Sequence, residues 1–408
     1  MFNDFFQLVQ DLLLTLQTKT VRFMKVIHFI TDDKFLNSTI EMFEEIEGLN
    51  NRYLIISDEE TPFHFLTSTK VEKIKTSDIN NVILDPTSTD VIVIHNLSSL
   101  PCEYIKEIHP RIKVVWFSWG FDTYANFYPQ FKLIKLKNRI KPKTISFRYR
   151  LRMLNESRRR HIKQLKKNDK KGRNDFISAV HRVDFYSGVF PIEWELLKKN
   201  SFFRAKPITY HYPTKKGYFT EQNLYEQTKP KGDSILLGNS GTKLGNHGNS
   251  LWRISKLNLH DRKVIVPLSY GGDTLYKSLL CKKGKKILGS NFVPLMSFLP
   301  ISEYTELIES VSIAIHNVEQ QAAVGNIILN LWSGAKIFFP EKSMNYQYFK
   351  SLDFHVFSIE KDLNQKEIDS YLSEKDILDN RKKVIQHFSF DSIKEKVKNS
   401  FKYIEQQL

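Results

Sequence analysis

The chain has 408 residues, 41% of them hydrophobic and 13% aromatic, which is enough apolar material for two cores and excludes disorder over most of the length. Its two cysteines exclude a disulfide framework or a cysteine metal cluster, and they fit a reducing compartment. The formal net charge is +16, and no apolar run approaches the ~20 residues that a membrane span needs.

Residues 1–23 precede the first predicted strand and begin "MFNDFFQLVQDLLL". Phe5, Val9 and Leu13 lie near one face of a predicted amphipathic helix. Two interpretations stay open: an upstream extension ahead of a native start at Met24, or a membrane anchor. We expect no secretory signal peptide in this segment.

The next segment predicts a parallel sheet. "MKVIHFITDD" (24–33) indicates a first strand that ends in a loop, and a helix follows from about Asn37 to Gly48. Further short runs rich in β-branched and aromatic residues are typical of strands buried on both faces, and segments of helical length separate them. These runs are "NRYLIIS" (51–57), "DVIVIHNL" (90–97) and "IKVVWFSW" (112–119).

A basic segment, residues 132–173, comes next. It holds 18 Lys and Arg residues against two acids, so the rest of the chain is neutral. One interpretation is the solvated face of an ordinary helix, and the other is a cationic surface against anionic lipid headgroups. No nucleic-acid motif accompanies the charge, so we expect no nucleic-acid partner.

The strand rhythm restarts after a polar stretch at 206–232, where we expect a hinge. The later strand candidates are "SILLGNS" (234–240), "RKVIVPLSY" (262–270), "KKILGSN" (285–291), "VSIAIHNV" (311–318) and "AKIFFPE" (335–341). Two such series predict an α/β protein with two Rossmann-like domains. Their expected bounds are 24–205, which includes the basic segment, and 206–408, with a last helix at about 391–406 that runs back across the cleft.

Polar residues follow the predicted strands at their carboxyl ends, where open α/β sheets bind ligands. In the first half these positions hold Asp32, Asp33, His95 and the stretch "WGFDTY" (119–124). In the second half "GNSGTKLGNH" (238–247) leads into a helix, as phosphate-binding loops do, although the P-loop spacing is absent. A plain helix cap explains the same residues.

A second candidate anion site precedes a helix predicted at about 324–332. The residues just before it are Glu319, Gln320 and Gln321, and Gly334 ends it. The positive end of the helix dipole would point at a diphosphate or at sugar hydroxyls. An ordinary cap loop remains the alternative.

These second-half motifs resemble a known family. "ILLGNSGTKLGNH" (235–247), "KVIVPLSYGG" (263–272) and "EQQAAVGNIILNLWSGAKIFF" (319–339) are similar to the bacterial 4-acetamido-4,6-dideoxygalactose (Fuc4NAc) transferases, glycosyltransferase family 56. The first half matches more weakly, through "VIHFITDD" and "WFSWGFDTY". The resemblance implies the GT-B fold, in which two Rossmann-like domains face each other across a cleft.

The resemblance also implies an activity. An enzyme of this family would move a Fuc4NAc-like amino-deoxy sugar from a nucleotide diphosphate, dTDP, to a polyprenyl-diphosphate-linked glycan during synthesis of a bacterial surface polysaccharide such as enterobacterial common antigen. It would be a peripheral protein on the cytoplasmic face of the inner membrane. No cofactor or metal is expected, because we see no metal-binding DxD motif in the second domain, where the nucleotide sugar should bind.

The expected site residues divide between the two domains. We expect donor binding by Gly238, Asn239, Ser240, Asn246, His247, Tyr270, Gln320, Gln321, Gly325 and Asn326. Contacts with the acceptor or the membrane are expected from Trp119, Tyr124, Arg158, Arg159 and Arg160.

A carboxylate in the first domain is the expected base for a direct displacement. Asp122 is slightly preferred for its motif, Asp33 is the other candidate, and His95 is a third that would orient the acceptor. Two functional alternatives stay open. One is a GT-B transferase with a different nucleotide sugar and acceptor, and the other is a membrane- or nucleic-acid-binding adaptor that uses the basic segment.

Overall fold

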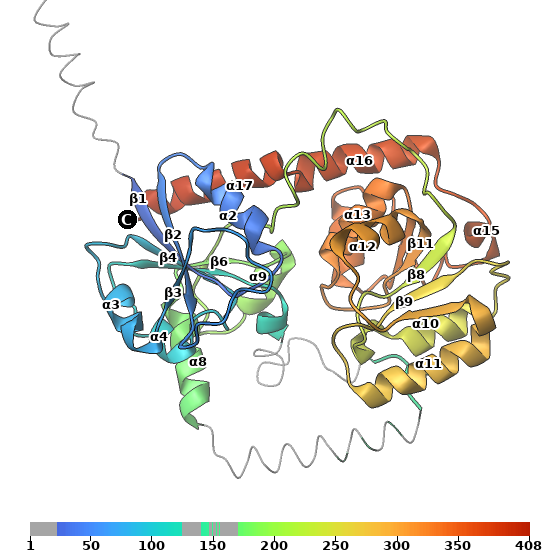
Figure 1. The fold of residues 1–408 in the computed structure, drawn as a ribbon, viewed down its shortest axis with the longest axis horizontal. Helices are drawn as coiled ribbons and strands as arrows, with labels where there is room; N and C mark the ends of the chain where they lie inside the picture. The colour runs from blue at the N-terminus through green and yellow to red at the C-terminus, as the bar shows by residue number, and fades with distance from the viewer. Residues whose placement is uncertain (1–22, 125–139, 147–148, 150–151, 153–154, 156–169) are drawn as a thin grey trace, which may run out of the picture.

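The computed structural model of the protein describes residues 23–124, 140–146, 149, 152, 155 and 170–408. The predictions for residues 1–22 and for Arg158, Arg159 and Arg160 lie outside these residues, as does most of the basic segment. The described chain forms two lobes, each built on one sheet, and two C-terminal helices span both of them (Figure 1).

The first lobe contains a parallel sheet in the order β3-β2-β1-β4-β5-β6-β7. Its strands are β1 (Met24–Phe29), β2 (Leu49–Ile56), β3 (Val71–Ile74), β4 (Val91–His95), β5 (Lys113–Phe117), β6 (Phe185–Ser187) and β7 (Lys206–Pro207). Its helices are α2 (Leu36–Glu44), α3 (Ile79–Ile83), α4 (Cys102–Ile105), α8 (Lys170–Arg182) and α9 (Pro191–Leu197), with a 3₁₀ turn, η1, at Thr76–Asp78.

The central strand β4 explains why this sheet is covered on both faces. All five of its residues are buried. Ile92 and Ile94 pack into the core on one face, whereas Val91 and Val93 pack into the core on the other. Side chains alternate along a strand, so a run of apolar β-branched residues needs helices on both sides.

The second lobe contains a parallel sheet in the order β10-β9-β8-β11-β12-β13. Its strands are β8 (Ser234–Leu237), β9 (Val264–Pro267), β10 (Phe292–Leu295), β11 (Val311–Ile315), β12 (Lys336–Phe339) and β13 (Phe357–Ser358). Its helices are α10 (His247–Ile254), α11 (Thr274–Leu288), α12 (Ile301–Glu309), α13 (Val324–Ser333), α14 (Met344–Ser351) and α15 (Gln365–Ile368), with 3₁₀ turns η2 (Lys243–Gly245) and η3 (Gly289–Asn291).

The predicted strand at 285–291 is wrong. Lys285 to Leu288 form the last turn of α11, and Gly289, with φ 55°, ends the helix. The strand begins at Phe292 instead. The apolar pair Ile287–Leu288 belongs to the helix period, which a short run cannot distinguish from a strand.

The two last helices connect the lobes. Helix α16 (Glu374–Phe388) packs beside α13 in the second lobe, and α17 (Phe390–Glu405) reaches the first lobe (Figure 1). Phe390, Val397 and Phe401 of α17 are buried in the first-lobe core. The predicted α/β class with two Rossmann-like lobes is confirmed, and the last helix returns across the molecule as expected.

Another connection between the lobes lies in the segment before β8. Tyr212 packs against the first-lobe core, whereas Phe219 is part of the second-lobe core. Among the described residues, no helix has both the length and the apolar character required to cross a bilayer.

Candidate functional site

The loops that follow β5 and β11 meet between the lobes. Gly120 has φ 82°, and a Cβ atom at this position would overlap the side-chain oxygen of Gln321. Only glycine allows this approach without strain. The "WGFDTY" and "EQQAAVGN" motifs, about 200 residues apart in the sequence, therefore lie side by side.

Tyr124 reinforces this junction. Its hydroxyl donates to Glu193 Oε1 at 2.6 Å and lies 2.9 Å from Met344 Sδ of the second lobe. The ring is buried in the second-lobe core. Burial raises the pKa of Glu193 to about 7, and its other oxygen accepts from the Phe190 amide. Tyr124 therefore joins the lobes, and nothing in this geometry exposes it to an acceptor.

Asp122 is enclosed at the start of the same loop. Its carboxylate is 2% exposed and accepts hydrogen bonds from Trp116 Nε1 (2.8 Å) and Ser118 Oγ (2.8 Å). The amides of Leu97 and Trp119 donate to it as well. Burial raises its pKa against the lowering effect of these donors. The carboxylate ties β4, β5 and the loop together, and both of its oxygens are occupied.

Asp32 and Asp33 follow β1 and have different environments. Asp32 accepts from the amides of His64, Phe65 and Leu66, which lowers its pKa although burial opposes the shift. Asp33 is partly exposed, and burial raises its pKa. Asp32 thus fixes a loop, whereas Asp33 is the carboxylate at this strand end whose position permits proton exchange with a bound hydroxyl.

His95 lies inside the first lobe in a line of hydrogen bonds. Asn51 Oδ1 lies 3.1 Å from His28 Nε2, and His28 Nδ1 lies 3.1 Å from His95 Nε2. His95 Nδ1 then meets the Tyr212 hydroxyl at 3.2 Å, and the Trp119 indole N–H donates to the same hydroxyl. Burial lowers the pKa of both imidazoles. His95 is therefore a neutral support for Trp119 and is not free to act as a base.

In the second lobe, β8 and β11 are neighbours, so the loops that follow them share one edge of the sheet. Gly238 has φ 74°, and a Cβ atom there would come 2.6 Å from His247 Nε2. Ser240, 7% exposed, pairs with the Thr242 hydroxyl at 3.3 Å. The loop from Gly238 to Gly245 is closed over the buried ring of His247.

The loops after β8 and β9 also pack together through glycine. The Gly241 amide donates to the Tyr270 carbonyl at 2.8 Å. Gly272 has φ 69°, and a Cβ atom on it would overlap the carbonyl oxygen of Gly241. These two loops form one rigid rim at the carboxyl end of the sheet.

We therefore expect Gly272→Ala to destabilise the protein by about 2 kcal/mol or more, because a positive φ and a backbone overlap act together. Gly325→Ala is the matched control, since no atom lies within 4 Å of its Cβ position and its φ is not positive. Urea unfolding measures both variants. Equal stability of the two would contradict the close packing of these loops.

Tyr270 lies on the outer side of this rim. Its hydroxyl accepts from Asn239 Nδ2 at 3.0 Å, and its ring is nearly parallel to that of Phe298, with centroids 6.2 Å apart. Both rings are substantially exposed, at 47% and 69%. Asn239 and Tyr270, two of the predicted donor residues, are thus brought together beside an aromatic surface.

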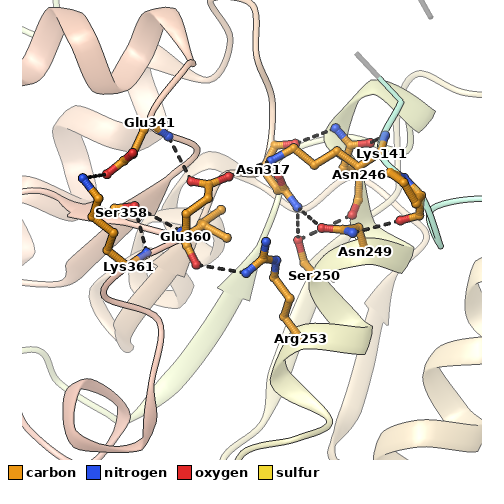
Figure 2. Close-up of polar contacts among 12 residues, drawn as sticks. Lys141, Asn246, Asn249, Ser250, Arg253, Asn317, Glu341, Ser358, Glu360 and Lys361 are labelled. Carbon is orange, nitrogen blue, oxygen red and sulfur yellow. Dashed lines mark hydrogen bonds and ion pairs between the residues drawn. The ribbon is translucent and has the colours of Figure 1, made fainter. Parts of the chain in front are cut away.

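Asn246 serves the structure. Asn246 has φ 51° and is fully buried. Its Oδ1 accepts from the Lys141 amide (2.8 Å) and Thr144 Oγ1 (3.0 Å), and its Nδ2 donates to the Asn317 carbonyl (2.8 Å). Figure 2 shows these contacts among the labelled residues. Asn246 connects the β8 and β11 loops to part of the basic segment, with no hydrogen-bonding atom left over for a donor.

Residues 140–146 of the basic segment therefore lie on the second lobe, although the expected domain bounds place them in the first, whereas residues 170–173 begin α8 of the first lobe. Asn249 Nδ2 donates to the Pro142 carbonyl, and Lys141 Nζ pairs with Glu360 at 3.2 Å (Figure 2). Lys143 Nζ lies 3.7 Å from the centroid of the Trp252 ring. Two of these basic side chains thus have partners within the protein.

The remaining donor candidates surround the start of α13. Asn326 Nδ2 donates to the Tyr304 hydroxyl at 2.7 Å, and the Cβ position of Gly325 is open. Gln320 is partly exposed in the preceding loop. Burial of these positions is incomplete, so a ligand can reach this helix end.

Sequence reasoning missed His316, which directly follows β11. It is 1% exposed, and neither of its ring nitrogens has a hydrogen-bond partner among the described residues. In the sequence it is the sixth residue of the apolar run "VSIAIHNV", where it resembled the polar end of a strand. Its position next to the Gln320–Gln321 loop was the available signal. Within the described ranges, no cluster of His, Cys, Asp or Glu side chains is arranged to hold a metal ion.

Comparison with known families decides the class of protein. The family described as 4-alpha-L-fucosyltransferase, glycosyl transferase group 56, matches residues 197–401, which is half of the chain. The chain belongs to glycosyl transferase group 56. As a group 56 protein it is a glycosyltransferase enzyme, and the predicted family is confirmed. The match covers the second-lobe motifs, while Asp33, His95 and Asp122 lie before it.

Several solved structures similar to this group 56 transferase are glycosyltransferases with the GT-B fold. They include the lipopolysaccharide outer core galactosyltransferase WaaB (10% identity, 93% of this chain and 99% of that chain, TM-score 0.57). AviGT4, involved in avilamycin A biosynthesis, has 8% identity over 95% and 99% of the two chains, with TM-score 0.55. Alr3699/HepE of Anabaena, in complex with UDP and glucose, has 10% identity over 93% and 100%, with TM-score 0.57. Such identities establish the GT-B fold alone. A comparison with curated protein sequences gave no match.

Proposed function

We propose that this transferase moves a Fuc4NAc-like amino-deoxy sugar from dTDP to a polyprenyl-diphosphate-linked glycan. The proposed setting is the cytoplasmic face of a bacterial inner membrane, during assembly of a surface polysaccharide. The observation that carries the proposal is the meeting of the loops after β5 and β11 at Gly120 and Gln321. It brings a first-lobe strand end, suited to an acceptor, against the second-lobe loops that the family match covers.

The donor diphosphate is proposed to lie at the start of α13, next to Gln321. Ala323 precedes this helix in the left-handed conformation, and no side chain caps it. Its first-turn amides are therefore available to an anion, and the helix dipole favours negative charge there. As the bond between the sugar and the phosphate breaks, charge builds on the departing diphosphate, and these amides stabilise it. We propose that this arrangement needs no metal or cofactor.

Asp33 is the proposed base. In a direct displacement the acceptor hydroxyl gives its proton to the Asp33 carboxylate, its oxygen bonds to the anomeric carbon, and the nucleoside diphosphate leaves with the electron pair. Asp33 is partly exposed at the end of β1, whereas the oxygens of Asp122 are occupied. Trp119, supported by the His95 line of hydrogen bonds, is proposed to contact the acceptor.

Thermal unfolding with nucleotides tests the donor part of the proposal. We expect dTDP to raise the melting temperature more than UDP, GDP or CMP, because the nucleotide of the natural donor should bind most tightly. A ligand that binds only the folded protein adds about 2.7 kcal/mol to the free energy of unfolding when its concentration is 100 times its Kd. A larger increase in melting temperature with UDP or GDP would indicate a donor that carries that nucleotide instead of dTDP. No response to any nucleotide would contradict the donor site. Binding to anionic vesicles that weakens at high salt tests the membrane part.

A further inference from the structure

His316 is a buried side chain whose hydrogen-bonding capacity is unused. Its exposed fraction is 1%, and both Nδ1 and Nε2 have no partner among the described residues. Burial lowers its pKa to about 4, so at neutral pH the ring carries one N–H donor and one lone pair. Buried polar atoms in native proteins nearly always have partners, and leaving both unmet destabilises the fold. The ring therefore indicates a group that is supplied from outside the chain.

The strand register places this ring on the face that α13 covers. The amide of His316 donates to the Phe338 carbonyl at 2.9 Å, so the ladder of β11 continues through it. Ala314, two residues earlier and hence on the same face, packs in the core that contains Ile327 and Ile328 of α13. The His316 ring also stacks on the ring of Phe339, which belongs to the same core, with 5.9 Å between the ring centroids.

The N-terminus of α13 lies at the same end of the sheet. In a strand–helix connection of a parallel sheet, the helix runs back along the strand, so it begins where the strand ends. The helix is ten residues long and has no side-chain cap. The loop before it is held by Asn345, whose side chain donates to the Ala322 carbonyl at 3.0 Å. A fixed, uncapped helix start thus lies at the end of the sheet where His316, whose ring nitrogens have no partner among the described residues, follows β11.

We propose that His316 binds the glycosyl diphosphate joint of the donor, its N–H donating to a phosphate oxygen and its other nitrogen accepting from a sugar hydroxyl. This inference rests on the proposed function and deepens it. A ligand that offers both an acceptor and a donor is required, and a sugar joined to a diphosphate offers both. The α13 amides carry the rest of the phosphate charge. His316 then contacts the sugar and the phosphate attached to it, and makes no contact with the nucleobase.

The test uses the full chain with nitrogen-15-labelled histidine. The imidazole signals of His316 are assigned by their loss in His316→Gln, and inorganic diphosphate, dTDP and thymidine are added separately to the wild-type protein. We expect diphosphate and dTDP to shift the His316 signals and thymidine to leave them unchanged. Because the wild-type protein carries this readout, it does not depend on the folding of a variant.

Affinity and stability of variants give a second readout. We expect His316→Phe to weaken dTDP binding about ten- to hundredfold, since a hydrogen bond to a charged group is lost. The unliganded protein should melt no lower than the wild type, because the ring loses no partner within the chain. His260→Phe is the control. His260 is exposed, pairs with Asp369 and precedes β9, so it lies at the amino end of the strands, whereas His316 lies at their carboxyl end.

The outcomes separate the two proposals. If dTDP binds the wild type while the His316 signals stay in place and His316→Phe binds equally well, the inference is overturned and the proposed function stands. A His316→Phe variant that is much less stable without ligand also overturns it, because that marks a structural histidine. If neither diphosphate nor any nucleotide binds the wild type, the proposed function fails and the inference with it.

Discussion

Asp33→Asn is expected to lower kcat by about 10²–10⁴, with little change in stability, because an amide cannot take the proton of the acceptor hydroxyl. The side chain accepts one backbone hydrogen bond from the Phe35 amide at 3.2 Å, which an asparagine oxygen can keep. Steady-state transfer to the glycan acceptor measures the effect. Since burial raises the pKa of Asp33, the acid limb of the pH–rate profile should lie above the ordinary range of an aspartate.

Asp32→Asn is the neighbouring control for Asp33. Asp32 takes three backbone amides of the 64–66 loop, so its replacement should lower stability more than Asp33→Asn does. Its effect on kcat should be the smaller of the two. An Asp33→Asn enzyme that keeps more than a tenth of the wild-type kcat would remove Asp33 from the role of base.

Asp122→Ala is expected to destabilise the protein by on the order of 3–5 kcal/mol, the largest stability effect we predict. Removing the carboxylate takes the acceptor from Trp116 Nε1 and from the amides of Leu97 and Trp119, whereas Ser118 Oγ keeps its contact with Thr123 Oγ1. Each buried donor that loses its acceptor lowers the free energy of unfolding by about 1–3 kcal/mol. Urea unfolding at neutral pH measures the loss.

Asp122→Asn distinguishes a structural carboxylate from a catalytic one. Asparagine keeps one acceptor oxygen and turns an NH₂ group towards donors, so it should also lose stability. A catalytic Asp122 would instead give a stable but inactive Asp122→Asn enzyme. That result would restore the preference that the WGFDTY motif suggests from sequence alone.

The sheets of both lobes were predictable because their central strands are dense runs of β-branched residues. "VIVIH" in β4 and "VSIAI" in β11 are buried on both faces, and their short length and β-branched content favour strands over helices. The edge strands carry no such signal, since β3 is "VEKI" and β7 is two residues long. The loops at the strand ends followed from the sheet rule, which places ligands at carboxyl ends.

Individual site residues were less predictable, because a polar residue in a loop can serve a ligand or the chain itself. Asn246 and Asp122 have the residue types expected of ligand contacts, yet their side-chain atoms form hydrogen bonds within the protein. Asn246 contacts residues 141 and 144, a pairing over about 100 residues that no local pattern reveals. His316 could not be predicted because the lack of hydrogen-bond partners for its two ring nitrogens, among the described residues, is visible only in the folded structure.

Helix α17 has a consequence for biosynthesis. The sheet of the first lobe is formed by residues 24–207, but the core of this lobe contains Phe390, Val397 and Phe401 of α17. Phe401 packs edge-on against Phe43 at 5.4 Å, and Lys394 pairs with Glu45 of the same region. At ~5–20 residues per second, ribosomes need about 20–80 s to reach those codons. The nascent first lobe therefore lacks part of its apolar core until residues 390–404 have been synthesised.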